Sequence, residues 1–288
     1  MKGRTSIFMS AYARLFACCI AALPLHTAFT QEVSTLEDLI TLLEQKSTEV
    51  VSWSSDISME MKVGGVDMSY TGTTYNKGES SLTSITVSVR GQRIAVKTVI
   101  GPDQVQWNES MVGGKRQISM LDMNKVAEAA NVDAEMLKAK MGSGPGSPIN
   151  INLTGKELLD DFSLTYDLKY VGKETLGDEA VYTVQGIIFG DIKGNAGRRG
   201  PLSSAGITAN KIRMSIGAED GFLRSMEMID GRGKSILTLT YTNVVLNPDL
   251  DDRMFVYVAP PGSTITDMTP LTLERVKKDR FIEEANTP

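Results

Sequence analysis

Hydrophobic and polar side chains alternate with a period of two through most of this 288-residue chain. The clearest run covers residues 207–245, where short turns around Gly221 and Arg232 separate three alternating segments. Period-two alternation between tight turns predicts antiparallel strands with one apolar face and one polar face. The apolar face must be covered, so the remaining segments are candidates for its cover.

The same period organises residues 53–120, which divide into about six alternating segments. Glycine pairs such as Gly64-Gly65 separate some of them, and a two-residue glycine turn is typical of a β-hairpin. Further alternation at 164–171 and 180–188 brings the total to about eleven strands. The sequence therefore predicts a mainly β fold.

Helical spacing of apolar residues appears in four other segments. Residues 36–47 follow a capping box that begins at Ser34, and residues 122–141 show the same period. A short helix is predicted from residue 154 to 162, and Thr269-Pro270 can begin a last helix over 270–285.

Two glycine-rich stretches, 142–150 and 190–206, interrupt these patterns. The second contains basic residues but no Gly-Lys-Ser/Thr ending, which a phosphate-binding loop requires. We therefore interpret 190–206 as a flexible surface loop. The stretch 142–150 could be an interdomain linker, but neither half alone has the elements to cover both sides of its sheet, so we interpret it as a flexible loop within a single domain.

The first 30 residues have the layout of a secretory signal peptide. Lys2 and Arg4 precede a short apolar stretch, which Pro24 interrupts, and small and polar residues follow. The stretch is too short to span a bilayer well. We predict export across the inner membrane, with residues 31–288 as the mature periplasmic domain. The alternative is a lipoprotein anchored through Cys18.

Removal of the signal peptide would change which side chains are available for catalysis or metal binding. Cys18, Cys19 and His26, the only histidine, all lie in the predicted signal. The mature chain then has no Cys/His zinc site, no Ser-His-Asp triad and no cysteine nucleophile, and we expect no metal or cofactor. A paired-carboxylate mechanism at 160–161 or 251–252 is conceivable, but such pairs next to turns are usually solvated. We expect a protein that is not an enzyme.

Charge narrows the range of partners. The chain has 30 basic and 35 acidic residues, and its first 30 residues hold three basic and no acidic ones, so residues 31–288 have a balance of −8. This balance favours solubility and argues against nucleic acid or an anionic membrane surface as the main partner. No second long apolar stretch follows, so we expect a mature chain that does not span the membrane.

Methionine gathers on the predicted apolar strand faces, for example at Met59, Met61, Met214, Met226 and Met228. Methionine is not a favoured strand residue, but it is flexible and is over-used at surfaces that accept varied apolar ligands. These faces therefore fit a cavity for such ligands. The alternative is an ordinary core in which methionine fills gaps.

Four features follow one another in a distinctive order: the opening helix, the hairpin from Gly101 to Trp107, the turn at Asp220-Gly221 and the ending FVYVAPPG at 255–262, followed by Asp267. This order resembles the outer-membrane lipoprotein carrier (LolA-like) superfamily of lipoprotein-sorting proteins. It implies an unclosed, strongly curved antiparallel half-barrel with helices over its concave side. It also implies that 255–257 form a strand and that a short final strand carries the acidic residue.

The resemblance further implies an apolar hollow that holds the acyl chains of lipids or lipoproteins for transport or sorting toward the outer membrane. The alternative function is an envelope sensor that contacts another envelope protein and carries nothing. The lid residues would be Met136, Leu137 and Met141. The predicted cavity residues are Trp53, Ile57, Met59, Met61, Met68, Tyr70, Val87, Val89, Ile94, Val96, Trp107, Met120, Met214, Met226, Met228, Leu239 and Tyr241.

Overall fold

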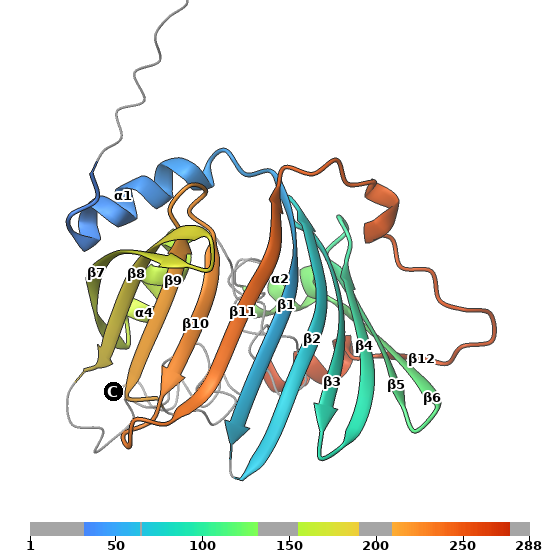
Figure 1. Ribbon diagram of the computed structural model, residues 1–288. Helices are drawn as coiled ribbons and strands as arrows, with labels where there is room; N and C mark the ends of the chain where they lie inside the picture. Colours follow the sequence, from blue (N-terminus) through green and yellow to red (C-terminus); the bar gives the residue numbers. More distant parts are fainter. Residues whose placement is uncertain (1–31, 64, 132–154, 190–208, 277–288) are drawn as a thin grey trace, which may run out of the picture. The chain divides into compact units, whose positions relative to one another are not determined.

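The computed structural model describes residues 32–63, 65–131, 155–189 and 209–276. Every helix and strand below lies within Ser34–Pro288, the second of the two units into which the chain divides (Figure 1). The predicted signal peptide, the lid residues and both glycine-rich loops lie outside the described residues.

The described residues form one sheet of twelve strands in the order β12-β6-β5-β4-β3-β2-β1-β11-β10-β9-β8-β7. All neighbours pair antiparallel except β12 and β6, and the edge strands β12 and β7 do not meet, so the curved sheet is unclosed (Figure 1). This confirms the predicted half-barrel. The strands are β1 Ser52–Val63, β2 Val66–Lys77, β3 Ser80–Val89, β4 Gln92–Ile100, β5 Val105–Val112, β6 Lys115–Asp122, β7 Tyr166–Leu176, β8 Glu179–Ile188, β9 Lys211–Gly217, β10 Leu223–Ile229, β11 Ser235–Leu246 and β12 Ile265–Asp267.

The helices in the described ranges are short. They are α1 (Leu36–Ser47), α2 (Met123–Ala130), α4 (Gly155–Ser163), the 3-10 helix η3 (Asp252–Phe255) and helical residues 269–276. The capping box of α1 is present one residue later than predicted, with Thr35 and Asp38. The predicted continuous helix over 122–141 is wrong, because Asn131 takes a left-handed conformation (φ 50°) that ends α2, and residues 132–141 lie outside the described residues.

The segment after β11 also differs from the prediction. Residues 255–257 are not a strand: Phe255 ends η3, whose first turn Asp251 caps, and residues 256–260 have no regular structure. The prolines at 260 and 261 have no backbone N–H to donate to a ladder. The short final strand is confirmed as β12, and the Asp267 carboxylate accepts a hydrogen bond from the Thr269 backbone N–H (2.8 Å).

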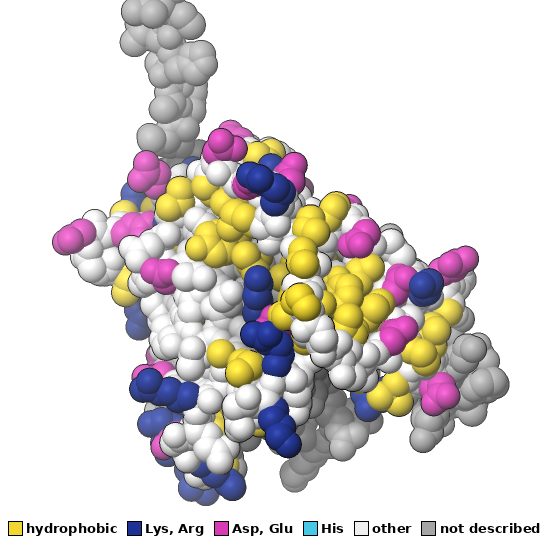
Figure 2. Space-filling view, turned by 90° about the vertical axis from the view of Figure 1, so that its right-hand side faces the viewer, with side chains coloured by type: hydrophobic (Ala, Val, Ile, Leu, Met, Phe, Trp, Pro, Cys, Tyr) yellow, Lys and Arg dark blue, Asp and Glu magenta, His cyan; other side chains and the backbone are white. Residues whose placement is uncertain are grey.

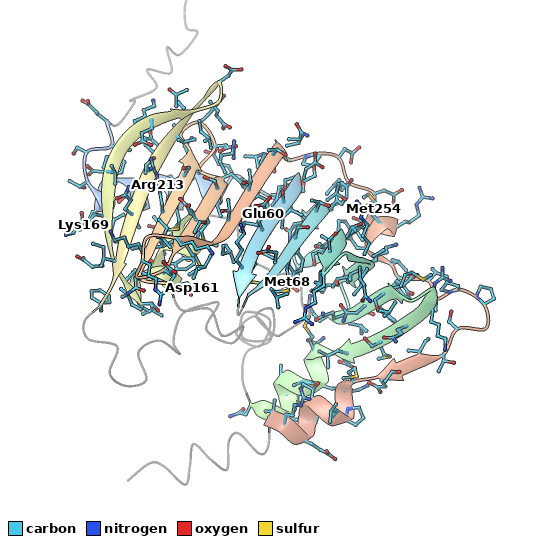
Figure 3. The ribbon with its side chains drawn as sticks, turned by 60° about the horizontal axis from the view of Figure 1, so that its bottom comes forward. Glu60, Met68, Asp161, Lys169, Arg213 and Met254 are labelled. Atoms are coloured by element: carbon cyan, nitrogen blue, oxygen red, sulfur yellow. The ribbon has the colours of Figure 1, made fainter. Side chains whose placement is uncertain are left out.

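Helices pack at both ends of the sheet. At the β7 end, α1 contacts α4 and β7, and α1 buries Leu39 and Leu43. At the other end, Val126 of α2 packs in a cluster with Ile100 and Leu121, against which half-buried Leu273 also packs. Figure 3 shows α2 and helical residues 269–276 beside each other near β12 and β6.

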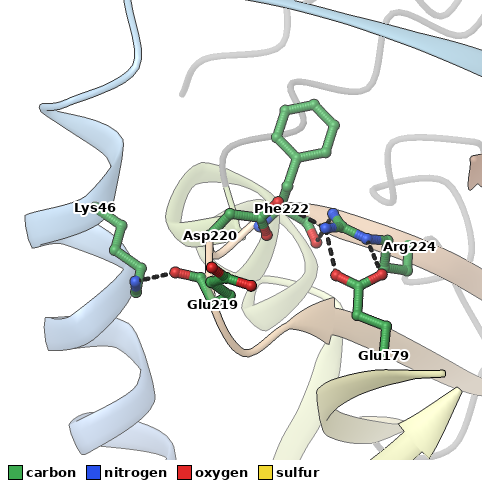
Figure 4. Close-up of polar contacts among 6 residues, drawn as sticks. All are labelled: Lys46, Glu179, Glu219, Asp220, Phe222 and Arg224. Carbon is green, nitrogen blue, oxygen red and sulfur yellow. Dashed lines mark hydrogen bonds and ion pairs between the residues drawn. The ribbon is translucent and has the colours of Figure 1, made fainter. Parts of the chain in front are cut away.

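A polar network fixes the β9–β10 turn. The Arg224 side chain, only 9% exposed as a residue, pairs with Glu179 and with Asp220 (2.6 Å), and it donates to the Phe222 carbonyl (3.2 Å) (Figure 4). The Lys46 ammonium of α1 donates to the Glu219 carbonyl in the same turn. The network therefore joins α1, β8 and the turn between β9 and β10.

Candidate functional site

The apolar face of the sheet is continuous across eight strands. In the ladder, residues directly opposite one another point to the same face, so the register traces rows across the sheet. The first row runs from β8 to β4 through Val184, Met214, Met226, Leu239, Met59, Tyr70, Val87 and Ile94. The second runs through Gly186, Ile212, Met228, Leu237, Met61, Met68, Val89 and Gln92.

These rows bring most of the predicted cavity residues together. Ile57 pairs with Tyr241 one step along the same face, and Val96 follows Ile94 at the next inward position of β4. Trp53 lies near the start of β1 and contacts Phe222 edge-on, with ring centroids 5.1 Å apart. The list of predicted cavity residues omitted Val184, Ile212 and Leu237, although the same alternation places Ile212 and Leu237 on the apolar face.

Trp107 and Met120 are corrections, because both lie on the outer face. Trp107 pairs with Val99 and with Met120, whereas the inward residues of β5 are polar ones such as Asn108, which pairs with Thr98. The Trp107 ring stacks on Tyr257 at 5.0 Å between centroids. Segment 250–257 crosses the outer face here and buries Phe255, so the apolar side of β5 points outward.

The outer face is otherwise polar. Ser58, Thr71 and Thr86 pair in sequence across β1, β2 and β3, each one residue from an apolar inward neighbour. Figure 3 labels Glu60 and Met68; Glu60 pairs with Ser69, so it faces away from Met68.

Burial divides the apolar face into two parts. Met214, Met226 and Leu239 have no exposed surface, and Met59 is 4% exposed. The neighbouring strands carry apolar side chains that are only half-buried, and we call these six the β2–β4 patch: Met68, Tyr70, Val87, Val89, Ile94 and Val96. Burial raises the pKa of the Tyr70 hydroxyl, so it stays neutral at physiological pH. The patch therefore presents uncharged, partly accessible surface that continues a fully buried core.

Three of the four paired carboxylates have structural partners, whereas burial and the neighbouring Asp160 raise the pKa of the Asp161 carboxyl. Asp160 pairs with Lys156 (3.1 Å), Asp252 with Lys77 (2.6 Å), and Asp251 both caps η3 and pairs with Arg253. Within the described ranges, no group of three or more Cys, His, Asp and Glu side chains is arranged to hold a metal.

Neither a protein-family model nor a curated protein matches the sequence. Solved structures do resemble it. An uncharacterized conserved protein from Thermus thermophilus shares 11% identity, with a TM-score of 0.44, over 80% of this chain and 98% of that one. MucB shares 11% with a TM-score of 0.43, over 77% of this chain, which spans only 62% of MucB.

The lipoprotein LppX from Mycobacterium tuberculosis shares 11% identity with a TM-score of 0.35, over 74% of this chain and 97% of that one. The structural neighbours include lipoprotein-sorting, LolA-like domains. At such identities and TM-scores, this likeness does not assign a function to the chain. Among the described helices, none is both long enough and apolar enough to cross a membrane.

Proposed function

We propose that this protein binds acyl chains of lipids or lipoproteins on the apolar face of its sheet, in the periplasm, and serves their transport or sorting toward the outer membrane. The observation that carries the proposal is the β2–β4 patch. It is apolar, half-buried and continuous with the methionine-rich core of β9–β11, so a guest chain would extend a surface that already exists.

The energetics support an acyl ligand. Each buried methylene contributes about 0.8 kcal/mol, so eight methylenes on the patch contribute about 6 kcal/mol before the cost of association. Met61 and Met68 pair across β1 and β2, and flexible thioethers adjust to chains of different shape. A hydrocarbon ligand needs no charged partner on this face.

The proposal includes a non-enzymatic role. Beyond residue 26 the chain has no histidine, and Asp160, Asp251 and Asp252 are engaged in ion pairs. Export by the N-terminal segment would place the sheet among envelope lipids, either free or anchored through Cys18.

Two adjacent residues of β3 offer a matched test. Val87 belongs to the patch, whereas Thr86 points to the outer face and is also half-buried. Val87→Asp places a charge where the acyl chain would lie, and desolvating a carboxylate costs several kcal/mol. Thr86→Asp adds the same charge to the same strand.

We expect Val87→Asp to weaken binding of a fluorescent fatty-acid probe at least about tenfold, and Thr86→Asp to change it less than about twofold. Circular dichroism of both variants checks that they are folded. Equal affinities of a folded Val87→Asp variant and the unmodified protein would refute acyl binding on the patch.

A further inference from the structure

The turns of the sheet fall at two opposite ends. The β1–β2, β3–β4 and β5–β6 turns share one end, because alternate turns of an antiparallel meander lie on the same side. The β10–β11 turn lies at the same end, because Met61, near the end of β1, pairs with Leu237, near the start of β11. We call this the hairpin end and define it as residues 62–63, 65–67, 89–93, 112–116 and 230–235.

The hairpin end is basic. Its four turns contain seven basic and two acidic residues, a balance of +5. The basic residues are Lys62, Arg90, Arg93, Lys115, Arg116, Arg232 and Lys234, and the acidic ones are Asp67 and Asp230. In Figure 2 many of the Lys and Arg side chains lie in the lower half of the view, the side on which these turns lie in Figure 1.

The opposite end is acidic. Its segments are 49–52, 77–80, 100–105, 176–179, 217–222 and 246–253, and together they contain ten acidic and two basic residues, a balance of −8. Both basic residues, Lys77 and Arg253, form salt bridges with neighbouring carboxylates. The sheet thus carries opposite charge at its two ends although the whole chain is acidic.

The basic groups at the hairpin end are available to a partner. Arg116 pairs with Glu109 (2.8 Å), but the other six form no salt bridge with any residue in the described part of the chain, and all six are exposed. Arg232 and Lys234 lie close enough to Asp230 to lower the pKa of its carboxyl, but structural ion pairing does not account for Lys62, Arg90, Arg93 or Lys115.

Apolar side chains lie beside these charges. Met111 and Val112 are 37% and 40% exposed, and they pair across the β5–β6 hairpin with Arg116 and Lys115. Basic groups next to exposed apolar side chains are the combination that binds the interface of an anionic bilayer. An acidic protein partner would pair with the basic side chains, but its binding would not explain why apolar side chains are exposed beside them.

We propose that the hairpin end docks on an anionic phospholipid surface, with the basic turns facing the head groups and the acidic end pointing away. The separation of charge orients the molecule as it approaches, since a like-charged end is repelled. The inference does not depend on acyl binding, although docking in this orientation brings Met68 and Val89 of the β2–β4 patch near the bilayer.

The test compares two triple variants of the full chain. Lys62→Ala, Arg93→Ala and Lys115→Ala remove three charges from the hairpin end. Lys97→Ala, Lys173→Ala and Arg253→Ala remove three exposed charges elsewhere and give the same net charge. Arg90 is kept, because its positive φ of 50° would strain an alanine. Binding is measured by co-flotation with phosphatidylcholine vesicles, with and without phosphatidylglycerol.

The unmodified protein is expected to bind the phosphatidylglycerol vesicles more tightly than the neutral ones, and less tightly as salt is raised. The hairpin-end variant should bind them roughly 100-fold more weakly, at about fivefold per lost charge, and the other variant within about threefold of the unmodified protein. Equal binding to both kinds of vesicle, equal losses in both variants, or no vesicle binding would overturn the proposal. Binding to soluble polyglutamate alone would replace it with an acidic protein partner. Fatty-acid probe affinity in the same variants reports separately on acyl binding.

Discussion

The close approach of β2 and β3 depends on Gly72, where the two strands leave no room for a side chain. Gly72 pairs with Ile85, and a Cβ added at Gly72 would lie 2.0 Å from the Ser84 carbonyl oxygen and 2.7 Å from the Ile85 Cα. Both are backbone atoms, so neither can rotate away. The Gly72→Ala substitution must therefore push the strands apart.

The cost follows from the displacement. Real Cβ contacts are essentially never shorter than 3.0 Å, so the gap of 2.0 Å must open by about 1 Å. Such a shift breaks or weakens about three ladder hydrogen bonds, each of which contributes about 1 kcal/mol. We expect the free energy of unfolding to fall by about 3 kcal/mol, and the melting temperature of a domain this size by roughly 6–12 °C.

Thermal unfolding followed by circular dichroism tests this value. Thr71→Ala is the matched control, because Thr71 is exposed, precedes Gly72 in the same strand and points to the outer face. It should lower the free energy of unfolding by less than about 1 kcal/mol. A Gly72→Ala protein as stable as this control would show that the strands have room for a methyl group, and the steric reasoning would be wrong.

Two further predictions concern polar groups. Arg224→Met leaves Asp220 and Glu179 without their cation. Urea unfolding should show that the free energy of unfolding falls by about 3 kcal/mol, the lower bound for a buried pair, because the Glu179 side chain is 40% exposed. A fall of less than about 1 kcal/mol would contradict this. Burial and the hydrogen bond to Glu109 raise the pKa of Tyr257 to about 12. The contribution of this neutral hydroxyl to stability is therefore complete below pH 10 and is lost as the pH rises through 12. A difference titration of tyrosinate absorbance against Tyr257→Phe should locate this step, and a midpoint near pH 10 would refute the prediction.

The sequence predicted the inward residues well wherever one face of a strand is apolar and the other polar. In β9 and β11, Met214 and Leu239 alternate with charged or hydroxyl-bearing residues, and the register places them as expected. Slipping such a strand by one residue would expose its whole apolar set, so the pattern fixes the face.

The prediction failed where both faces are covered. An apolar residue, Trp107, stands at an outward position of β5 because segment 250–257 packs on the outer face there. Period-two alternation cannot reveal this cover. The same segment misled the strand prediction at 255–257, since Phe255 and Tyr257 alternate with valine while contacting the sheet without joining it. Apolar periodicity also ran past Asn131, because it gives no signal for a left-handed residue that ends a helix.

Net charge was the least informative quantity, for a topological reason. A balance summed along the chain gives equal weight to every turn, but an antiparallel meander sends alternate turns to opposite ends of the sheet. The turns at 89–93 and 100–105 are close in sequence, yet one contributes two positive charges to the hairpin end and the other a negative charge to the acidic end. An overall negative balance therefore argues against an anionic surface only for a molecule whose charges are evenly distributed. For this sheet, the sum over alternate turns is the physically meaningful quantity, and its sign at the hairpin end is the opposite of the sign for the whole chain.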